Sequence, residues 1–322
     1  MTGPDIGDLL TQWSYRSSPI AARIRINRLR HWMTGRRPAP QWRMVRPVTQ
    51  ATRWNVLFLY APSGGLDPDQ HRILDRVREL AGSLLIVLAT PHDHHPAVLN
   101  LADALIVKDL PGFDFSAYRI ALDAIATRSA GATVYVQNDS VLGPFGDIDG
   151  FVQRAPWDLT GFIGARTVEN HISSFAFILR DVTPARMAAL RLVLSPAWRC
   201  DDFDAVILLQ ETRLARIASR SMSVGAYWYV PTQPAREPAI MRAMKHATGT
   251  ARHRIDVTGD ATLACPVGLL DAGFPFLKRS LFTKFAGLHD EAILHEALLV
   301  RKWRDAAAET SQPGFAPPAH ML

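Results

Sequence analysis

The sequence predicts an α/β fold around a doubly wound, mostly parallel sheet. Apolar runs of strand length alternate with segments of helical spacing, and the first two such runs are Asn55–Tyr60 and Leu84–Ala89. This alternation is typical of βαβ units, in which parallel strands are covered by helices. The chain has 322 residues, of which 48% are hydrophobic and 20% charged, so it can bury the core that such a fold needs.

Each predicted element has a local signal. The apolar run Asn55–Tyr60 ends at the turn Pro62–Gly65, and Asp67 is placed to cap the helix that follows as far as Gly82. The run Leu84–Ala89 ends at a Thr-Pro pair and is expected to be the second strand. The same patterns predict strands over 105–107, 133–137, 159–165 and 174–179, and helices over 116–126, 184–193 and 211–221.

Positive charge is concentrated at the start of the chain, whose formal net charge is +6. Arginines interleave with apolar residues there as on a basic amphipathic helix, which suits an anionic membrane surface. The alternative is a solvated helix packed on the domain, and nucleic acid is not an expected partner because no nucleic-acid motif accompanies the arginines. We therefore predict an Arg-rich amphipathic helical arm and linker over 1–50, a domain over 51–305 and a disordered tail over 306–322.

Several other classes of protein are disfavoured. Cys200 and Cys265 are the only cysteines, which argues against a disulfide framework and fits a reducing, cytoplasmic setting. The histidines of Pro91–Pro96 are too close together for a zinc site to be expected. No apolar run is long enough to span a bilayer, so the expected location is cytoplasmic or peripheral on the inner face of the cell membrane.

A polar triplet, Asn138-Asp139-Ser140, follows the apolar run Val134–Gln137 and precedes a Gly-Pro turn. In open α/β sheets, ligands bind outside the carboxyl ends of the strands. A carboxylate at that place, here Asp139, can hold a divalent cation, and the cation can hold a diphosphate. The alternative is an Asx turn that ends the strand.

Three further residues could contact an anionic ligand. Gly112 permits a close approach before a helix N-terminus, where anions are favoured, and Asp114 either faces the ligand or caps that helix. His171 could donate to a phosphate or a sugar hydroxyl, although a lone histidine is more often structural.

Two charged residues fit roles in a transfer reaction. Ala205–Gln210 is predicted to be a strand that ends at Glu211, where a carboxylate is well placed as a general base or as a helix cap. Lys278 could neutralise a leaving diphosphate, or it could be a surface cation. A Rossmann dinucleotide site is disfavoured because Ser63-Gly64-Gly65 lacks the third glycine of the fingerprint, and no G-x-S-x-G elbow of a hydrolase is present.

Taken in order, segments between about 53 and 285 resemble the rhamnan synthesis protein F family of polysaccharide-building glycosyltransferases. The strongest match is Asn138–Pro144, in which the order Asn-Asp-Ser-x-x-Gly-Pro is kept. The other matching segments, in chain order, are Leu66–Pro68, Gly112–Phe115, Trp157–Gly161, His171–Phe175, the helix start at Glu211 and Phe274–Lys278.

The resemblance implies a GT-A-like fold and transfer of a sugar, in this family often rhamnose. The donor would be a nucleotide-diphosphate sugar, and the acceptor a surface polysaccharide or a lipid-linked glycan. It further implies that Glu211 deprotonates the acceptor in an inverting reaction and that Asp139 holds Mg²⁺ or Mn²⁺. The donor-binding residues implied in this way are Gly112, Asp114, Asn138, Asp139, Ser140, His171 and Lys278.

The sequence also departs from the family pattern. Asn138-Asp139-Ser140 has one carboxylate where the Asp-x-Asp motif has two, and Thr212 replaces the second acid after Glu211. These departures leave metal dependence open. The missing second carboxylate and an altered loop, Asp109–Gly112 in place of the family's usual Asn-Lys-Gly, support an alternative, a non-catalytic glycan- or nucleotide-binding protein that keeps the fold.

Overall fold

The computed structural model describes residues 11–91, 98, 100–166, 168–229 and 260–303. These residues form two compact units. The larger unit comprises the described residues of 11–139 and 146–229, and the smaller unit comprises 140–145 and 260–303.

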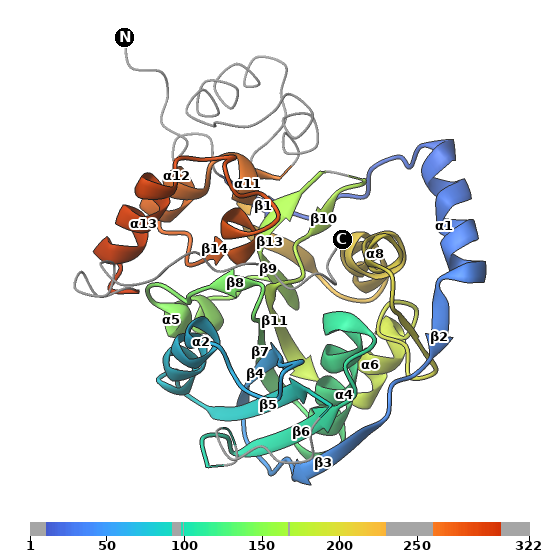
Figure 1. Cartoon of the computed structure of the whole chain (residues 1–322). Helices are drawn as coiled ribbons and strands as arrows, with labels where there is room; N and C mark the ends of the chain where they lie inside the picture. Colours follow the sequence, from blue (N-terminus) through green and yellow to red (C-terminus); the bar gives the residue numbers. More distant parts are fainter. Residues whose placement is uncertain (1–10, 92–97, 99, 167, 230–259, 304–322) are drawn as a thin grey trace. The chain divides into compact units, whose positions relative to one another are not determined.

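The described part of the larger unit contains a ten-stranded sheet in the order β1-β13-β9-β11-β7-β4-β5-β6-β3, with β10 paired to β9 outside this path (Figure 1). Strands β4, β5, β6, β7, β9 and β13 run in one direction, whereas β1, β3, β10 and β11 run the opposite way. The predicted α/β class with a mostly parallel sheet is therefore confirmed, and it is consistent with a Rossmann-type, GT-A-like domain. The strands are β4 Arg53–Tyr60, β5 Ser83–Ala89, β6 Ala104–Lys108, β7 Ala132–Asn138, β9 Leu159–Ala165, β10 His171–Ile172, β11 Ala176–Val182 and β13 Val224–Tyr229.

The register of the parallel strands brings their carboxyl ends to one edge. Tyr60 at the end of β4 pairs with Ala89 of β5, and Ala89 pairs with Lys108 of β6. On the other side of β4, Phe58 pairs with Asn138, the last residue of β7. This carboxyl edge is where an open α/β sheet binds its ligands.

Helices cover both faces of this sheet. Helix α2 begins where it was predicted, because Asp67 and Gln70 form a reciprocal capping box. In Figure 1, α2 and α5 lie on one side of the sheet, and α4, α6 and α8 on the other. On the second side, Val56 and Phe58 of β4 share one core with Leu122 of α4. The helices are α2 Pro68–Arg78, α4 Phe113–Arg128, α5 Ile148–Gln153, α6 Pro184–Leu190 and α8 Thr212–Ala218.

The N-terminal arm contains the expected helix, α1 Ala22–Thr34, but it is not helical throughout. Strand β1 (Thr11–Ser14) pairs with β13, and β3 (Trp42–Arg46) pairs with β6. Strand β2 (Arg36–Pro38) pairs with β12 (Trp198–Cys200) in a separate two-stranded sheet. The arm therefore supplies both edge strands, which pair with backbone groups that the edges of the sheet would otherwise expose.

The predicted strand over Ala205–Gln210 is wrong, because the segment is helical. Helix α7 (Phe203–Val206) continues into the π-helix η2 (Ile207–Glu211) and then into α8. Asp202 starts α7 by accepting a hydrogen bond of 2.8 Å from the Ala205 amide. A short, fully apolar run does not distinguish a buried helix from a strand, and the capping signal at Asp202 decides between them.

In the smaller unit, β8 (Val141–Leu142) pairs with β14 (Leu277–Lys278). Its helices are α11 Ala261–Ala264, α12 Pro266–Asp271 and α13 Glu291–Val300. The predicted tail and the histidines of Pro91–Pro96 lie outside the described residues. None of the helices formed by the described residues has the length and apolar character needed to cross a membrane.

Candidate functional site

Asp139 lies directly after β7 and is held as a hydrogen-bond acceptor. Its Oδ2 accepts a bond of 2.8 Å from the Tyr60 amide at the end of β4 and one of 2.5 Å from Nε2 of Gln70. Gln70 also closes the capping box of α2, because its Oε1 accepts a hydrogen bond from the Asp67 amide. Both polar atoms of the Gln70 side chain are therefore hydrogen-bonded. The Asp139 carboxylate is therefore held at the carboxyl edge of the sheet by hydrogen bonds from β4 and α2.

Asn138 and Asp114 contact each other beside it. Nδ2 of Asn138 donates to Oδ2 of Asp114 at 3.0 Å, and the Phe115 amide donates to Oδ1 of Asp114 at 2.9 Å. Withdrawal from solvent raises the pKa of Asp114 to about 7, and repulsion from the Glu211 carboxylate adds to this shift. Asp114 therefore exchanges its proton near neutral pH, which is a property common at functional sites.

The turn before Asp114 needs glycine. Gly112 is the N-cap of α4 with a φ of +100°, and a Cβ atom there would lie 2.7 Å from Oγ of Ser116. The loop is held from below by Lys108, a buried lysine whose Nζ donates to the carbonyl oxygens of Asp109 and Pro111 at 2.7 and 2.8 Å. Burial lowers the pKa of Lys108 to about 8.

Glu211 is the last residue of the π-helix η2. Its Oε1 accepts hydrogen bonds from the amide and the hydroxyl of Ser174, at 3.1 and 3.0 Å. The Ser174 carbonyl in turn accepts a bond of 3.0 Å from the Tyr118 hydroxyl. π-Helical turns inside longer helices are frequent at functional sites because they redirect a side chain. Here the π-helical turn ends at Glu211, whose Oε1 is held by the two hydrogen bonds from Ser174.

Tyr118 connects the three acids. Burial raises the pKa of the Tyr118 hydroxyl well above its usual range, and the carboxyl groups of Asp114, Glu211 and Asp139 add to this effect. The three carboxyl groups therefore lie within electrostatic reach of one side chain. Asp114 and Glu211 form no ion pair with any described lysine or arginine, although the charge of Lys108 acts on Asp114 at longer range. We name Asp114, Asn138, Asp139, Ser174 and Glu211 the carboxylate cluster.

Asp139 is the residue from which a divalent-cation site would be expected. Oδ2 of Asp139 already accepts two N–H bonds, and these donors would compete with a cation. No group of three or more His, Cys, Asp or Glu side chains within the described ranges is arranged to hold a metal. The residue roles proposed for this cluster are those of hydrogen-bonding and proton-accepting side chains, and binding of Mg²⁺ or Mn²⁺ stays a prediction.

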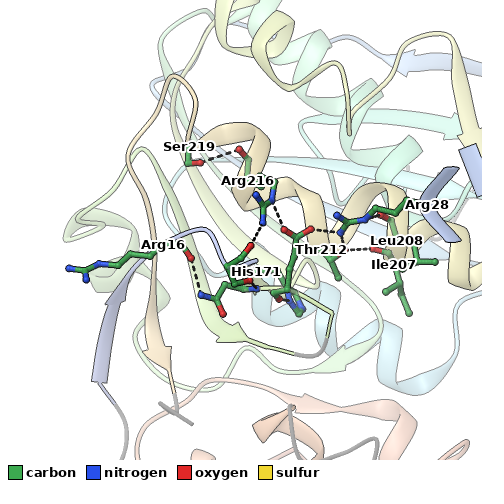
Figure 2. Close-up of polar contacts among 11 residues, drawn as sticks. Arg16, Arg28, His171, Ile207, Leu208, Thr212, Arg216 and Ser219 are labelled. Carbon is green, nitrogen blue, oxygen red and sulfur yellow. Dashed lines mark hydrogen bonds and ion pairs between the residues drawn. The ribbon is translucent and has the colours of Figure 1, made fainter. Parts of the chain in front are cut away.

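His171 belongs to a different cluster. It is buried, and its Nδ1 lies 2.8 Å from the carbonyl oxygen of Glu169. The buried Glu169 carboxylate forms ion pairs with Arg28 of α1 and Arg216 of α8, the two arginines that Figure 2 labels near His171 and Thr212. We name Arg28, Glu169 and Arg216 the arginine clasp. The described contacts of His171 thus support the structural alternative.

Ser140 and Lys278 lie in the smaller unit. The Arg279 amide, next to Lys278, donates to the Ser140 carbonyl at 2.9 Å. Nζ of Lys278 forms an ion pair of 2.7 Å with Asp260, and this pair lowers the pKa of the buried Asp260 carboxyl group. The charge of Lys278 is therefore already partly balanced within its own unit.

Three supporting residues were not predicted. Gln70 had a usable signal, because Asp67-x-x-Gln70 is a capping box, but the pattern does not show that the amide also reaches Asp139. Lys108 is a charged residue at the end of an apolar strand, a position that suggests a buried role. Ser174 carries no signal, since its contact with Glu211 joins residues 37 positions apart.

Comparisons with known proteins add little to this picture. No protein-family model matches the chain, and no curated protein matches it. Among solved structures, it is similar to the crystal structure of S. aureus TarS 1-349, with a TM-score of 0.31 and 11% sequence identity over 76% of this chain and 78% of that chain. This likeness is too weak to inform fold or activity. The fold assignment rests on the strand order, and the resemblance to the rhamnan synthesis protein F family stays an inference from the sequence.

Proposed function

We propose that this chain is a glycosyltransferase that moves a sugar from a nucleotide-diphosphate donor to a hydroxyl group of a glycan or a lipid-linked acceptor. The observation that carries the proposal is the carboxylate cluster. It gathers Glu211, Asp114 and Asn138 at the carboxyl edge of a parallel sheet, where such folds bind ligands. The family resemblance of the sequence points to the same reaction.

In this proposal Glu211 is the general base of an inverting transfer. The acceptor oxygen attacks C1 of the sugar while its proton passes to Glu211, and the bond from C1 to the diphosphate oxygen breaks with its electron pair leaving on the diphosphate. Ser174 supports this role because its two hydrogen bonds fix one carboxylate oxygen and orient the other. Positioning of this kind contributes to the rate without a cofactor.

Asp114 and Asn138 are proposed to bind hydroxyl or amide groups of the donor. With its pKa raised to about 7, Asp114 can be a hydrogen-bond donor when neutral and an acceptor when ionised. Protonation of Asp114 also limits its repulsion of the Glu211 carboxylate. Asp139, with Oδ2 bound to Tyr60 and Gln70, is proposed to hold the edge of the site in shape.

The first experiment is a thermal-unfolding screen of the purified chain with UDP, GDP and TDP and their sugars, TDP-rhamnose included, each with and without Mn²⁺. Selective stabilisation by one nucleotide is expected, following mass action. Turnover of that donor is then measured as release of the nucleoside diphosphate. The absence of any shift at millimolar ligand would contradict the proposed donor site.

The screen also separates the proposal from a non-catalytic binding protein. That alternative draws on Asp139, whose Oδ2 is engaged in structural bonds. It predicts stabilisation by a nucleotide with neither transfer nor donor hydrolysis across a panel of glycan acceptors. The proposed enzyme releases nucleoside diphosphate, and Glu211→Gln should lower the rate of that release by about 10³-fold while leaving the nucleotide-induced shift in place.

A further inference from the structure

Helix α1 has a face that packs against the larger unit. Ile24, Arg28 and His31 are its half-buried residues, and their spacing places them on one side of a helix with about 3.6 residues per turn. Arg28 donates from Nε to the Leu208 carbonyl at 2.9 Å and from Nη2 to Oγ1 of Thr212 at 2.9 Å, besides its ion pair with Glu169. The helix is thus fixed to the unit along this face.

The opposite face is apolar and exposed. Ile26, Leu29 and Met33 are 67%, 57% and 63% exposed, and none of the residues of α1 is buried. The spacing of these three side chains gives one stripe on the side of the helix away from Arg28. A row of large apolar side chains in water is unfavourable, and such rows usually mark a contact with a partner.

Positive charge borders this stripe. Arg23, Arg25 and Arg30 are all exposed, and the sequence of α1 contains no Asp or Glu. Trp32 is 48% exposed at the end of the helix, with the guanidinium group of Arg36 lying 3.9 Å from its ring centroid. An apolar stripe flanked by arginines, with a tryptophan at the margin, has the chemistry of a helix that lies in the interface of a bilayer.

We propose that the exposed face of α1 binds the surface of an anionic lipid bilayer. Ile26, Leu29 and Met33 would enter the headgroup region, and the arginines would contact lipid phosphates. Nucleic acid fits the face less well, because its phosphates would satisfy the arginines but leave the apolar stripe in water. The proposal does not depend on the chemistry of the carboxylate cluster, so either one can fail while the other holds.

The test is flotation of the full chain with vesicles of phosphatidylcholine, alone or mixed with phosphatidylglycerol. Three variants are compared with the wild type: the apolar double variant Leu29→Asp/Met33→Asp, the charge double variant Arg23→Glu/Arg30→Glu, and Leu192→Asp. Leu192 is 45% exposed in the same unit but lies outside α1, so it is the matched control. Thermal unfolding confirms that each variant is folded.

The wild type and Leu192→Asp should float with the anionic vesicles, and added salt should weaken this binding. Both α1 double variants should lose at least about tenfold in partitioning. The proposal is overturned if the wild type stays in solution with anionic vesicles at low salt, or if the apolar double variant floats as well as the wild type. The proposal is also overturned, in favour of nucleic acid, if an RNA oligonucleotide displaces the chain from vesicles and the apolar double variant binds that RNA as well as the wild type does.

Discussion

The carboxylate cluster and the arginine clasp lie in the same unit, but their acids have opposite electrostatic surroundings. In the clasp, the buried Glu169 carboxylate is flanked by two guanidinium groups. In the cluster, Asp114 meets an amide and another carboxylate, and its pKa rises to about 7. An acid that is paired with arginines stabilises the fold, whereas an acid without an ion pair is available to interact with a ligand.

The two clusters are also connected through one helical segment. In the π-helix that ends at Glu211, two backbone carbonyl groups accept hydrogen bonds from side chains. Thr212 donates to the Ile207 carbonyl at 2.8 Å, and Arg28 donates to the Leu208 carbonyl. Arg28 of the N-terminal arm therefore helps to shape the turn that presents the proposed base.

The largest expected effect separates the two clusters by activity. Glu211→Gln should lower the rate of transfer by about 10³-fold, because it removes the proposed base but keeps the shape of the side chain. Release of nucleoside diphosphate in the presence of acceptor measures this, with Glu79→Gln, at an exposed position, as the control. Near-normal turnover in a folded Glu211→Gln protein would remove Glu211 from the mechanism.

The second effect concerns stability and belongs to the clasp. Glu169→Gln should lower the free energy of unfolding by about 3 kcal/mol, because it leaves two guanidinium groups without their acid. Denaturant unfolding gives the value. Asp181→Asn breaks an ion pair of 3.3 Å with Arg186 at a side chain that is 58% exposed, and it should cost less than about 0.5 kcal/mol. Equal losses in the two variants would contradict the structural role of the clasp.

The third effect is the pH dependence that Asp114 introduces. Its pKa is 3.8 in the unfolded chain and about 7 in the folded one, so between these values the folded state holds a proton that the unfolded state has released. Stability should therefore fall as the pH rises from about 4 to about 7. Between pH 5 and pH 8, Asp114→Asn should lose about 2 kcal/mol less unfolding free energy than the wild type loses. This value allows for the partial exposure of Asp114 to solvent.

This change is measured by denaturant unfolding at the two pH values. Asp75→Asn is the control, because the Asp75 side chain is 67% exposed and its removal should leave the pH profile unchanged. If Asp114→Asn and the wild type lose the same stability over this interval, Asp114 is not the titrating group.

The smallest effect tests the connection between the clusters. Arg28→Met and Arg216→Met each deprive Glu169 of one arginine, and both should lower stability to a similar degree. Only Arg28 also bonds to the π-helix, so Arg28→Met alone should lower turnover, by about tenfold, which corresponds to about 1.4 kcal/mol. Equal turnover in the two variants would show that the π-helix keeps Glu211 in place without Arg28.

Local patterns in the sequence predicted most of the larger unit. The parallel strands β4, β5 and β7 lie within two residues of the predicted ranges, and Asp67 caps α2 as expected. The same patterns did not separate strand from helix over Ala205–Gln210. A buried apolar run satisfies both, and only the cap at Asp202 and the surrounding packing favour the helix.

For the candidate site, the sequence predicted which residues stand at strand and helix ends. Asp114 follows β6 and Asn138 ends β7, but β4 and β5 lie between these two strands in the sheet, so the contact between the two side chains depends on the strand order and on the path of the chain into α4. The sequence did not predict that Glu169 would pair with Arg28 and Arg216, or that Lys278 would pair with Asp260.

The sequence by itself determined the class of the fold and the edge of the sheet at which acids gather, because both follow from periodicity and from residues at the ends of elements. Only the tertiary structure decided which acids form ion pairs and which accept other hydrogen bonds. The ion pair of Arg28 with Glu169 joins residues 141 positions apart, and the bond of Ser174 to Glu211 spans 37. No local pattern encodes such pairs, since they form when the arm and the helices pack onto the sheet and withdraw these charges from water.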